Sequence, residues 1–172
     1  YEVIAVSEEM TDQQKVASIR ALTNACGHKG MILGQQYDLD AERDEFTDIE
    51  KIHKLKTAKL IQVAMTLPHM GFENQTNTLA LLDEVGEKLG LAFQIMDDVL
   101  EVSSDSSTLG KSNQSDIKNK KLTYVSVFGK EESIEKAEAL SSICITKLKD
   151  SFVEEEVKNL IELAHFMVAR KH

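Results

Sequence analysis

The amino-acid sequence predicts an all-α fold, a single helical bundle with no linker-separated second domain. Apolar residues recur at helical spacing along nearly the whole chain. The 172 residues include 8 Gly and only 1 Pro, too few turn-forming residues for a sandwich of many short strands. Because 42% of the residues are hydrophobic, a chain of this length can build a core.

The first two predicted helices lie near the start of the chain. Thr11 and Gln14 have the spacing of a capping box, so we expect a helix that begins there and ends at Gly27. A second helix is predicted over residues 31–39. Gly34 lies within it, and because glycine has no side chain, a neighbouring helix could approach closely at this position.

The middle of the chain predicts the longest helices. One begins at a second capping box, formed by Thr47 and Glu50, and ends near Pro68. The next is expected over residues 78–102, and apolar residues occupy much of its circumference. A helix of that kind is buried, so we expect it at the centre of the bundle. Two amphipathic helices, over residues 131–148 and 153–169, complete the prediction.

A stretch rich in Ser, Asn and Gly, residues 103–116, predicts a loop after the central helix. A long loop inside a compact helical domain is often functional. The loop and the residues after it carry a series of charged residues: Asp105, Lys111, Asp116, Lys118, Lys120 and Lys121. These lysines could neutralise a diphosphate, and the alternative interpretation is an ordinary solvated loop.

The charge balance limits the partners of the protein. Lys and Arg number 20 against 29 Asp and Glu, which gives a formal net charge of −9. Nucleic acid is attracted mainly by positive charge, so we expect no nucleic-acid partner. An acidic protein that binds an anionic substrate needs a bridging cation.

The remaining composition favours a cytoplasmic protein. Cys26 and Cys144 match no metal-binding spacing and are interpreted as thiols in a reducing compartment. No stretch at the start has the form of a signal peptide. The longest apolar runs are shorter than the ~18–20 residues of a membrane span, so we expect a protein that does not span a membrane.

A cluster of acidic residues ends the predicted central helix. Gln94, Asp97, Asp98 and Glu101 are spaced i, i+3, i+4 and i+7, which places them on one face. Like charges on one face repel one another unless a cation satisfies them. Magnesium suits carboxylate oxygens, and no His or Cys cluster competes for a metal. The alternative is a solvated helical turn that binds nothing.

The sequence resembles the trans-isoprenyl diphosphate synthases, specifically the short-chain farnesyl or geranyl type from bacteria. The stretch from Phe93 to Glu101, followed by Leu109-Gly110-Lys111, Asp116, Lys121 and Thr123-Tyr124, resembles the second aspartate-rich region of that family. Upstream segments agree in order and spacing: residues 27–31, 34–35, 38–42, 52–53 and 56–57. The resemblance covers essentially the whole chain.

The resemblance implies the fold and the reaction. The fold would be an antiparallel helical bundle of the isoprenoid synthase type around a central cavity, with residues 1–172 forming the C-terminal part of one polyprenyl synthetase domain. The reaction would join an allylic diphosphate to isopentenyl diphosphate, giving farnesyl, geranyl or geranylgeranyl diphosphate. Three magnesium ions, which manganese could replace, would draw off the diphosphate and leave a carbocation. The resemblance also implies a homodimer.

The acidic face would hold the metal. Asp97 would bind magnesium directly, while Asp98 and Glu101 would bind it through water or neighbouring groups. Glu101 stands where the family usually has Asp, and its longer side chain would still reach a metal-bound water.

Other residues would hold the substrate. Lys56, Lys111 and Lys121 would hold the allylic diphosphate. Thr57 and Gln94 would lie beside the reacting carbon, where their oxygens would stabilise the developing positive charge.

Two further polar residues have structural interpretations. We expect Asp38 to form a hydrogen bond between close-packed helices. His53 has no second histidine as a ligand partner, so it is interpreted as a structural or surface residue.

The family's first aspartate-rich motif does not occur in this sequence, and neither does its isopentenyl-diphosphate cluster. We therefore expect a C-terminal half that does not catalyse condensation alone. Two alternatives stay open, a non-catalytic diphosphate-binding or regulatory subunit and a plain helical scaffold.

Overall fold

Every secondary-structure element that the structure describes is helical. The structure is a computed structural model that describes residues 1–43, 45, 47–108 and 121–170. In chain order the helices are α1 (Glu2–Ala5), α2 (Asp12–Cys26), α3 (Met31–Ala41), α4 (Ile49–His53), the π-helical turn η1 (Lys54–Ala58), α5 (Lys59–Thr66), the 3-10 turn η2 (Leu67–His69), α6 (Thr76–Thr108), α7 (Tyr124–Phe128), α8 (Lys130–Ser151) and α9 (Glu154–Ala169). The predicted all-α fold is confirmed, and no strand occurs among these residues.

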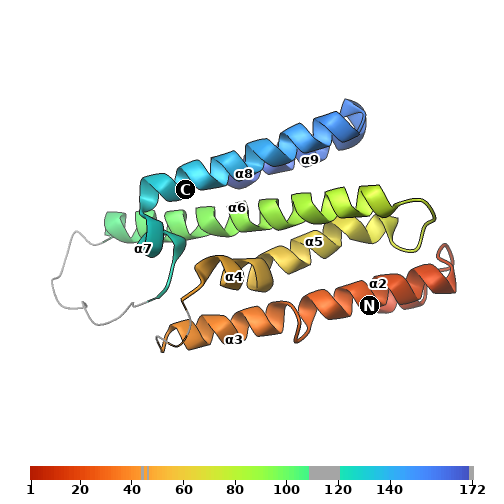
Figure 1. The fold of residues 1–172 in the computed structure, drawn as a ribbon, viewed down its shortest axis with the longest axis horizontal. Helices are drawn as coiled ribbons and strands as arrows, with labels where there is room; N and C mark the ends of the chain where they lie inside the picture. Colours follow the sequence, from red (N-terminus) through yellow and green to blue (C-terminus); the bar gives the residue numbers. More distant parts are fainter. Residues whose placement is uncertain (44, 46, 109–120, 171–172) are drawn as a thin grey trace.

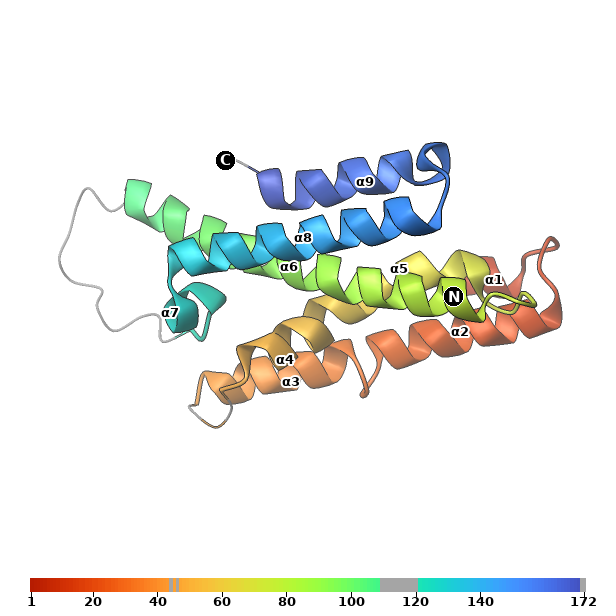
Figure 2. The same ribbon diagram turned by 45° about the horizontal axis from the view of Figure 1, so that its top comes forward.

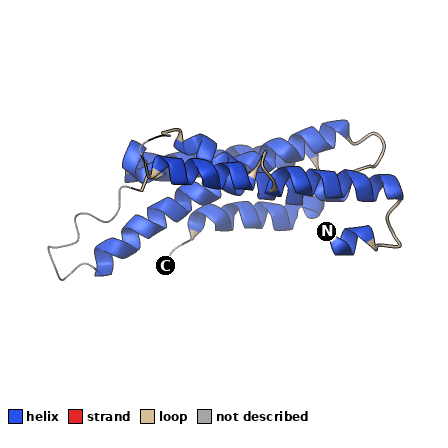
Figure 3. Cartoon of the chain, turned by 90° about the horizontal axis from the view of Figure 1, so that it is seen from below, coloured by secondary structure: helices blue, strands red, loops and turns tan. Residues whose placement is uncertain are grey.

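The long helices lie side by side with α6 in the middle (Figures 1 and 2). Figure 1 shows α2 and α3 end to end along one edge, with α4 and α5 between them and α6. On the opposite side of α6 lie α8 and α9, which Figure 2 separates. Seen from below, the bundle is elongated along the same direction (Figure 3). The predicted position of the longest helix at the centre is confirmed.

The core follows the length of α6 and divides into two clusters. One surrounds Ile52 and Ile95, which are 1% and 0% exposed, near the C-terminal half of α6. The other surrounds Leu89, Cys144 and Leu148, where α6 packs against α8 and α9. Because α6 is buried on several sides, it can hold side chains at defined positions against both neighbouring layers.

Two glycines bring backbones together at the π-helical turn η1. A Cβ on Gly34 of α3 would lie 2.3 Å from the backbone nitrogen of Lys56. A Cβ on Gly90 of α6 would lie 2.5 Å from the Cα of Ala58. The close approach predicted at Gly34 is confirmed, and η1 is clamped between α3 and α6.

The helix starts agree with the predictions in one case and differ in another. The capping box at Thr11 is present, since Gln14 N donates to Thr11 Oγ1 over 3.2 Å and Thr11 N donates to Gln14 Oε1 over 2.9 Å. The predicted capping box at Thr47 is wrong. Asp48 caps α4 instead and accepts a 3.0 Å hydrogen bond from Lys51 N, because its short carboxylate fits the N-cap position equally well.

The loop predicted from residue 103 is wrong at its start, because α6 continues to Thr108. Ser103 Oγ donates to Val99 O over 2.7 Å, so this hydroxyl is satisfied inside the helix. Among the described residues, no helix is both long and apolar enough to cross a membrane.

Candidate active site

The acidic residues at the end of α6 have separate partners. Asp97 Oδ1 lies 2.8 Å from Arg170 Nη2, and its side chain is 36% exposed. Glu101 Oε2 lies 3.0 Å from Lys121 Nζ in an exposed ion pair. The sequence predicted the shared helix face, and each of these two carboxylates keeps an accessible side chain on it.

Asp98 differs from its neighbours because it is buried. Only 3% of the residue is exposed. Its Oδ2 accepts a 2.7 Å hydrogen bond from Tyr124 N and lies 3.3 Å from His53 Nε2. Its Oδ1 accepts a 3.4 Å hydrogen bond from Gln94 Nε2. Protein donors therefore surround the carboxylate, and His53 is a buried structural residue, as one of its two interpretations proposed.

The three predicted metal ligands do not form one cluster. No group of three His, Cys, Asp or Glu side chains that could hold a metal occurs within residues 1–43, 45, 47–108 and 121–170. The physical reason is that Asp98 turns into the helix packing while Asp97 and Glu101 do not.

Asp97 and Glu101 fit one side of a magnesium site. They are carboxylates one helical turn apart, and their side chains are 36% and 51% exposed. Magnesium usually keeps several waters and takes one or two carboxylates together with substrate phosphates. A pair of accessible carboxylates on one helix is therefore a suitable donor set for it.

Thr57 and Gln94 meet across the interface between η1 and α6. Thr57 Oγ1 donates a 2.8 Å hydrogen bond to Gln94 Oε1, although the residues are 37 positions apart in the sequence. Single π-helical turns inside α-helices often mark functional sites. Here η1 carries both Lys56 and Thr57, so the turn directs two of the predicted site residues.

Lys56 lies against α3. Its Nζ is 2.6 Å from Asp38 Oδ2, and the Asp38 side chain is 16% exposed. Asp38 therefore joins two closely packed helices, and its predicted structural role is confirmed. The same contact holds the Lys56 ammonium in place, whereas the flexible side chain of an ordinary surface lysine has no such fixed partner.

Lys121 interacts with carboxylates of α6 and with Asp38, the partner of Lys56. The hydrogen bond to Glu101 raises the pKa of Lys121, and the charges of Glu101, Asp98 and Asp38 act in the same direction against desolvation. The ammonium is therefore fully protonated at neutral pH. Lys111, Asp105, Asp116 and the other lysines of the predicted loop lie outside the residues or side chains that the structure describes.

Arg170 is a site residue that the sequence did not reveal. Its guanidinium lies 4.1 Å from the centre of the Phe93 ring, and its Nη2 donates to the Phe93 carbonyl over 3.2 Å. Its Nε donates to the Met167 carbonyl over 3.2 Å, and the ion pair with Asp97 places the guanidinium beside the acidic face. A lone arginine after the last predicted helix matches no motif, so no sequence signal could have identified it.

An apolar cavity of about 760 Å³ lies between α5, α6 and α9. Its lining includes Ile61, Met65, Leu89, Leu160 and Met167. Leu89 lies on α6 two helical turns before Asp97. The central helix thus carries both the lining of an apolar cavity and the acidic face.

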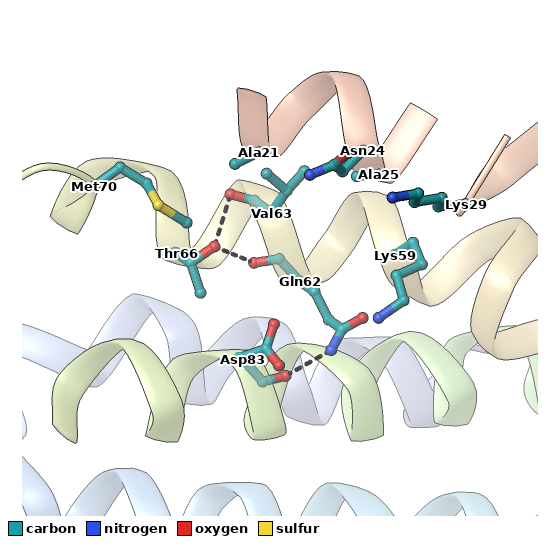
Figure 4. A pocket seen from close by; sticks show the side chains of 10 residues that line it. All are labelled: Ala21, Asn24, Ala25, Lys29, Lys59, Gln62, Val63, Thr66, Met70 and Asp83. Atoms are coloured by element: carbon teal, nitrogen blue, oxygen red, sulfur yellow. Dashed lines mark hydrogen bonds between the residues drawn. The ribbon is translucent and has the colours of Figure 1, made fainter. Parts of the chain in front are cut away.

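A second hollow of about 320 Å³ lies between α2, α5 and α6, where Gln62, Lys59 and Asp83 point into it (Figure 4). None of the predicted site residues lines it. None of them lines the apolar cavity either, so the candidate active site is defined by the side-chain contacts of α3, η1 and α6 and not by a hollow.

The fold and the site define a helical-bundle protein in which one long helix joins an acidic face to an apolar cavity. The chain belongs to the polyprenyl synthetase family, whose family model matches residues 2–164. It is 34% identical over 166 residues to the farnesyl diphosphate synthase of Escherichia coli K12, an alignment that covers 94% of this chain and 56% of that enzyme.

Solved structures give the same result for the fold. An FPP/GFPP synthase from Zymomonas mobilis superposes with a TM-score of 0.80 at 26% identity, covering 96% of this chain and 55% of that one. A geranyltransferase from Helicobacter pylori, solved with magnesium and isoprenyl diphosphate, superposes with a TM-score of 0.69 at 24% identity, covering 97% and 53%. The chain spans about half the length of these relatives, and the predicted isoprenoid synthase fold is confirmed.

Proposed function

We propose that residues 1–172 form the C-terminal part of the polyprenyl synthetase domain of a short-chain prenyltransferase. The complete enzyme would join an allylic diphosphate to isopentenyl diphosphate, giving farnesyl, geranyl or geranylgeranyl diphosphate. The observation that carries the proposal is the contact between Thr57 and Gln94. This contact places a polar pair, one residue from η1 and one from α6, beside the acidic face. The same helix α6 also lines an apolar cavity.

Asp97 and Glu101 would hold magnesium in this proposal. Both are accessible carboxylates on one face of α6, and a family member with the same fold was solved with magnesium and isoprenyl diphosphate. When bound, magnesium would neutralise diphosphate charge and make the diphosphate a better leaving group. The number of ions, three, and the use of manganese remain expectations from the family.

Lys56 and Lys121 would bind the diphosphate, together with Lys111. Both described ammonium groups are held by carboxylates, Lys56 by Asp38 and Lys121 by Glu101. Each ammonium has three donors, so it can keep its carboxylate partner and still donate to a phosphate oxygen. The lysines would therefore be oriented before the substrate arrives, which lowers the entropy cost of binding.

Thr57 and Gln94 would act at the reacting carbon. Their side-chain oxygens are polar acceptors on half-buried residues, where an aligned dipole stabilises developing positive charge more than it would in water. The cavity lined by Leu89 and Met65 would hold the hydrocarbon chain of the allylic substrate, because burial of apolar surface is favourable by about 25 cal/mol per Å².

A binding experiment tests the proposal. With magnesium present, calorimetry should show that geranyl diphosphate binds more tightly than inorganic pyrophosphate, because only the former fills the apolar cavity. Incubation with both substrates should give no condensation product, since one acidic face does not build a site for three ions. Robust product from these 172 residues would contradict the proposal.

The other two functions predict different results. A regulatory subunit would bind pyrophosphate and geranyl diphosphate equally, and a plain scaffold would bind neither. In the proposed enzyme we also expect a homodimer, as the family resemblance implies.

A further inference from the structure

We propose that Asp98 is a positioning residue, not a metal ligand, and that its carboxylate sets the orientation of the Gln94 amide toward Thr57. The inference rests on the proposed function only in the role it gives to Gln94. The geometry of the residues stands independently of that role.

Protein donors already occupy both oxygens of Asp98. Its Oδ2 accepts from Tyr124 N at 2.7 Å and lies 3.3 Å from His53 Nε2, while Oδ1 accepts from Gln94 Nε2. A residue that is 3% exposed has no open side for a hydrated cation. Coordination of magnesium would require these bonds to break, and a buried donor left without a partner costs about 1–3 kcal/mol.

The chemistry of the amide determines which way Gln94 faces. An ionised carboxylate only accepts hydrogen bonds, so the Gln94 group that faces Asp98 must be the NH₂. The amide oxygen must then point the other way. It does so, and accepts a 2.8 Å hydrogen bond from Thr57 Oγ1. Asp98 thereby places an oxygen, not a nitrogen, next to Thr57.

Three helical elements hold the Asp98 carboxylate in place. His53 lies one residue before η1, and Tyr124 is the first residue of α7 after the cap formed by Thr123. The carboxylate is therefore fixed from α4 and from α7 while it belongs to α6. Support from three elements makes its orientation, and that of Gln94, insensitive to the movement of any one side chain.

The test compares Asp98→Asn with Asp97→Asn, the same isosteric change at the adjacent residue. In Asp98→Asn, the new amide would keep its oxygen toward Tyr124 N and would present its NH₂ toward Gln94. Two facing NH₂ groups repel, so the Gln94 amide should flip and turn its own NH₂ toward Thr57. In NMR spectra, the NOE contacts of the Gln94 side-chain amide protons should move from the side chain at position 98 to that of Thr57.

Asp97→Asn should leave those NOE contacts unchanged. Calorimetry adds the metal readout, with inorganic pyrophosphate and magnesium as the probes. Asp97→Asn should raise the magnesium-dependent Kd at least about tenfold, and Asp98→Asn by no more than about threefold, a difference of roughly 0.7 kcal/mol or more in binding free energy.

A second variant keeps the proposal testable if Asp98→Asn is poorly folded. The double change Asp98→Asn with Gln94→Glu restores the pairing, because the carboxylate introduced at position 94 accepts from both Thr57 and the new amide at position 98. Because it needs no flip, its thermal midpoint should be at least as high as that of the single variant. A lower midpoint in the double variant, an unflipped Gln94 in Asp98→Asn, or a Kd loss equal to that of Asp97→Asn would each overturn the proposal. If the native chain binds no pyrophosphate, the proposed function fails, but the NMR comparison still decides the role of Asp98.

Discussion

Replacement of Gly34 by alanine should destabilise the protein, although alanine is the better helix former. A Cβ at this position would lie 2.3 Å from Lys56 N, 2.6 Å from Lys56 Cα and 2.8 Å from the Leu55 carbonyl carbon. The shortest of these distances is about 1.1 Å less than the 3.4 Å at which ordinary contact begins. All three partners are backbone atoms, so no side chain can rotate away and α3 must separate from η1.

The size of the effect follows from two opposing contributions. Overpacking a close interface typically costs about 1–3 kcal/mol of stability. Because the atoms facing Gly34 are backbone atoms that cannot rotate away, we expect a cost of about 3 kcal/mol for Gly34→Ala. Removal of a helical glycine returns about 1 kcal/mol. We expect a net loss of about 2 kcal/mol, which corresponds to a melting temperature roughly 4–8 °C lower for a chain of this size.

Urea unfolding followed by circular dichroism at helical wavelengths measures this loss. Ser142→Ala, at an exposed position in the middle of α8, is the control and should stay within about 0.5 kcal/mol of the native protein. If Gly34→Ala is instead more stable by about 1 kcal/mol, as for a helical glycine with open space around it, then α3 does not clamp η1.

Two further predictions concern Cys144 and Arg170. Burial raises the pKa of the Cys144 thiol from 9.0 to about 11, so the unfolded chain loses this proton at lower pH than the folded chain does. The free energy of unfolding therefore falls as pH rises between these two values. In urea titrations between pH 8.5 and 10.5, Cys144→Ala should lose roughly 1.5–2 kcal/mol less of this free energy than Cys26→Ala, which keeps the Cys144 thiol. An equal loss in both variants would show that Cys144 is not buried in solution. Arg170→Gln removes the cation paired with Asp97, so in calorimetry half-saturation with pyrophosphate should need about two- to fivefold less magnesium. A higher requirement would mean that Arg170 supports binding instead of competing with the metal.

The sequence allowed the helices to be predicted better than their ends. Helical periodicity gave the central position of α6, because a helix that is apolar around much of its circumference can only be buried. It could not give the extension to Thr108, since serines that bond back to carbonyls within a helix look the same in sequence as loop serines. The cap at Asp48 was missed because Thr47 and Asp48 are both good N-cap residues.

In the candidate site, too, some features could be predicted from local spacing and others could not. Spacing alone placed Gln94, Asp97 and Glu101 on one face, because 3.6 residues per turn fix that geometry. Which carboxylate is buried depends on contacts with His53 and Tyr124, 45 and 26 positions away from Asp98. Such distant contacts leave no local pattern. The same reason explains why the pairing of Asp97 with Arg170 could not be predicted.

The central claim is that α6 presents a metal-dependent diphosphate site based on Asp97. The most direct test is a calorimetric titration of the native chain and Asp97→Ala with inorganic pyrophosphate, with and without magnesium. We predict binding by the native chain only when magnesium is present, and a loss of that binding in Asp97→Ala. Binding that needs no magnesium, or that is unchanged in Asp97→Ala, would contradict the claim.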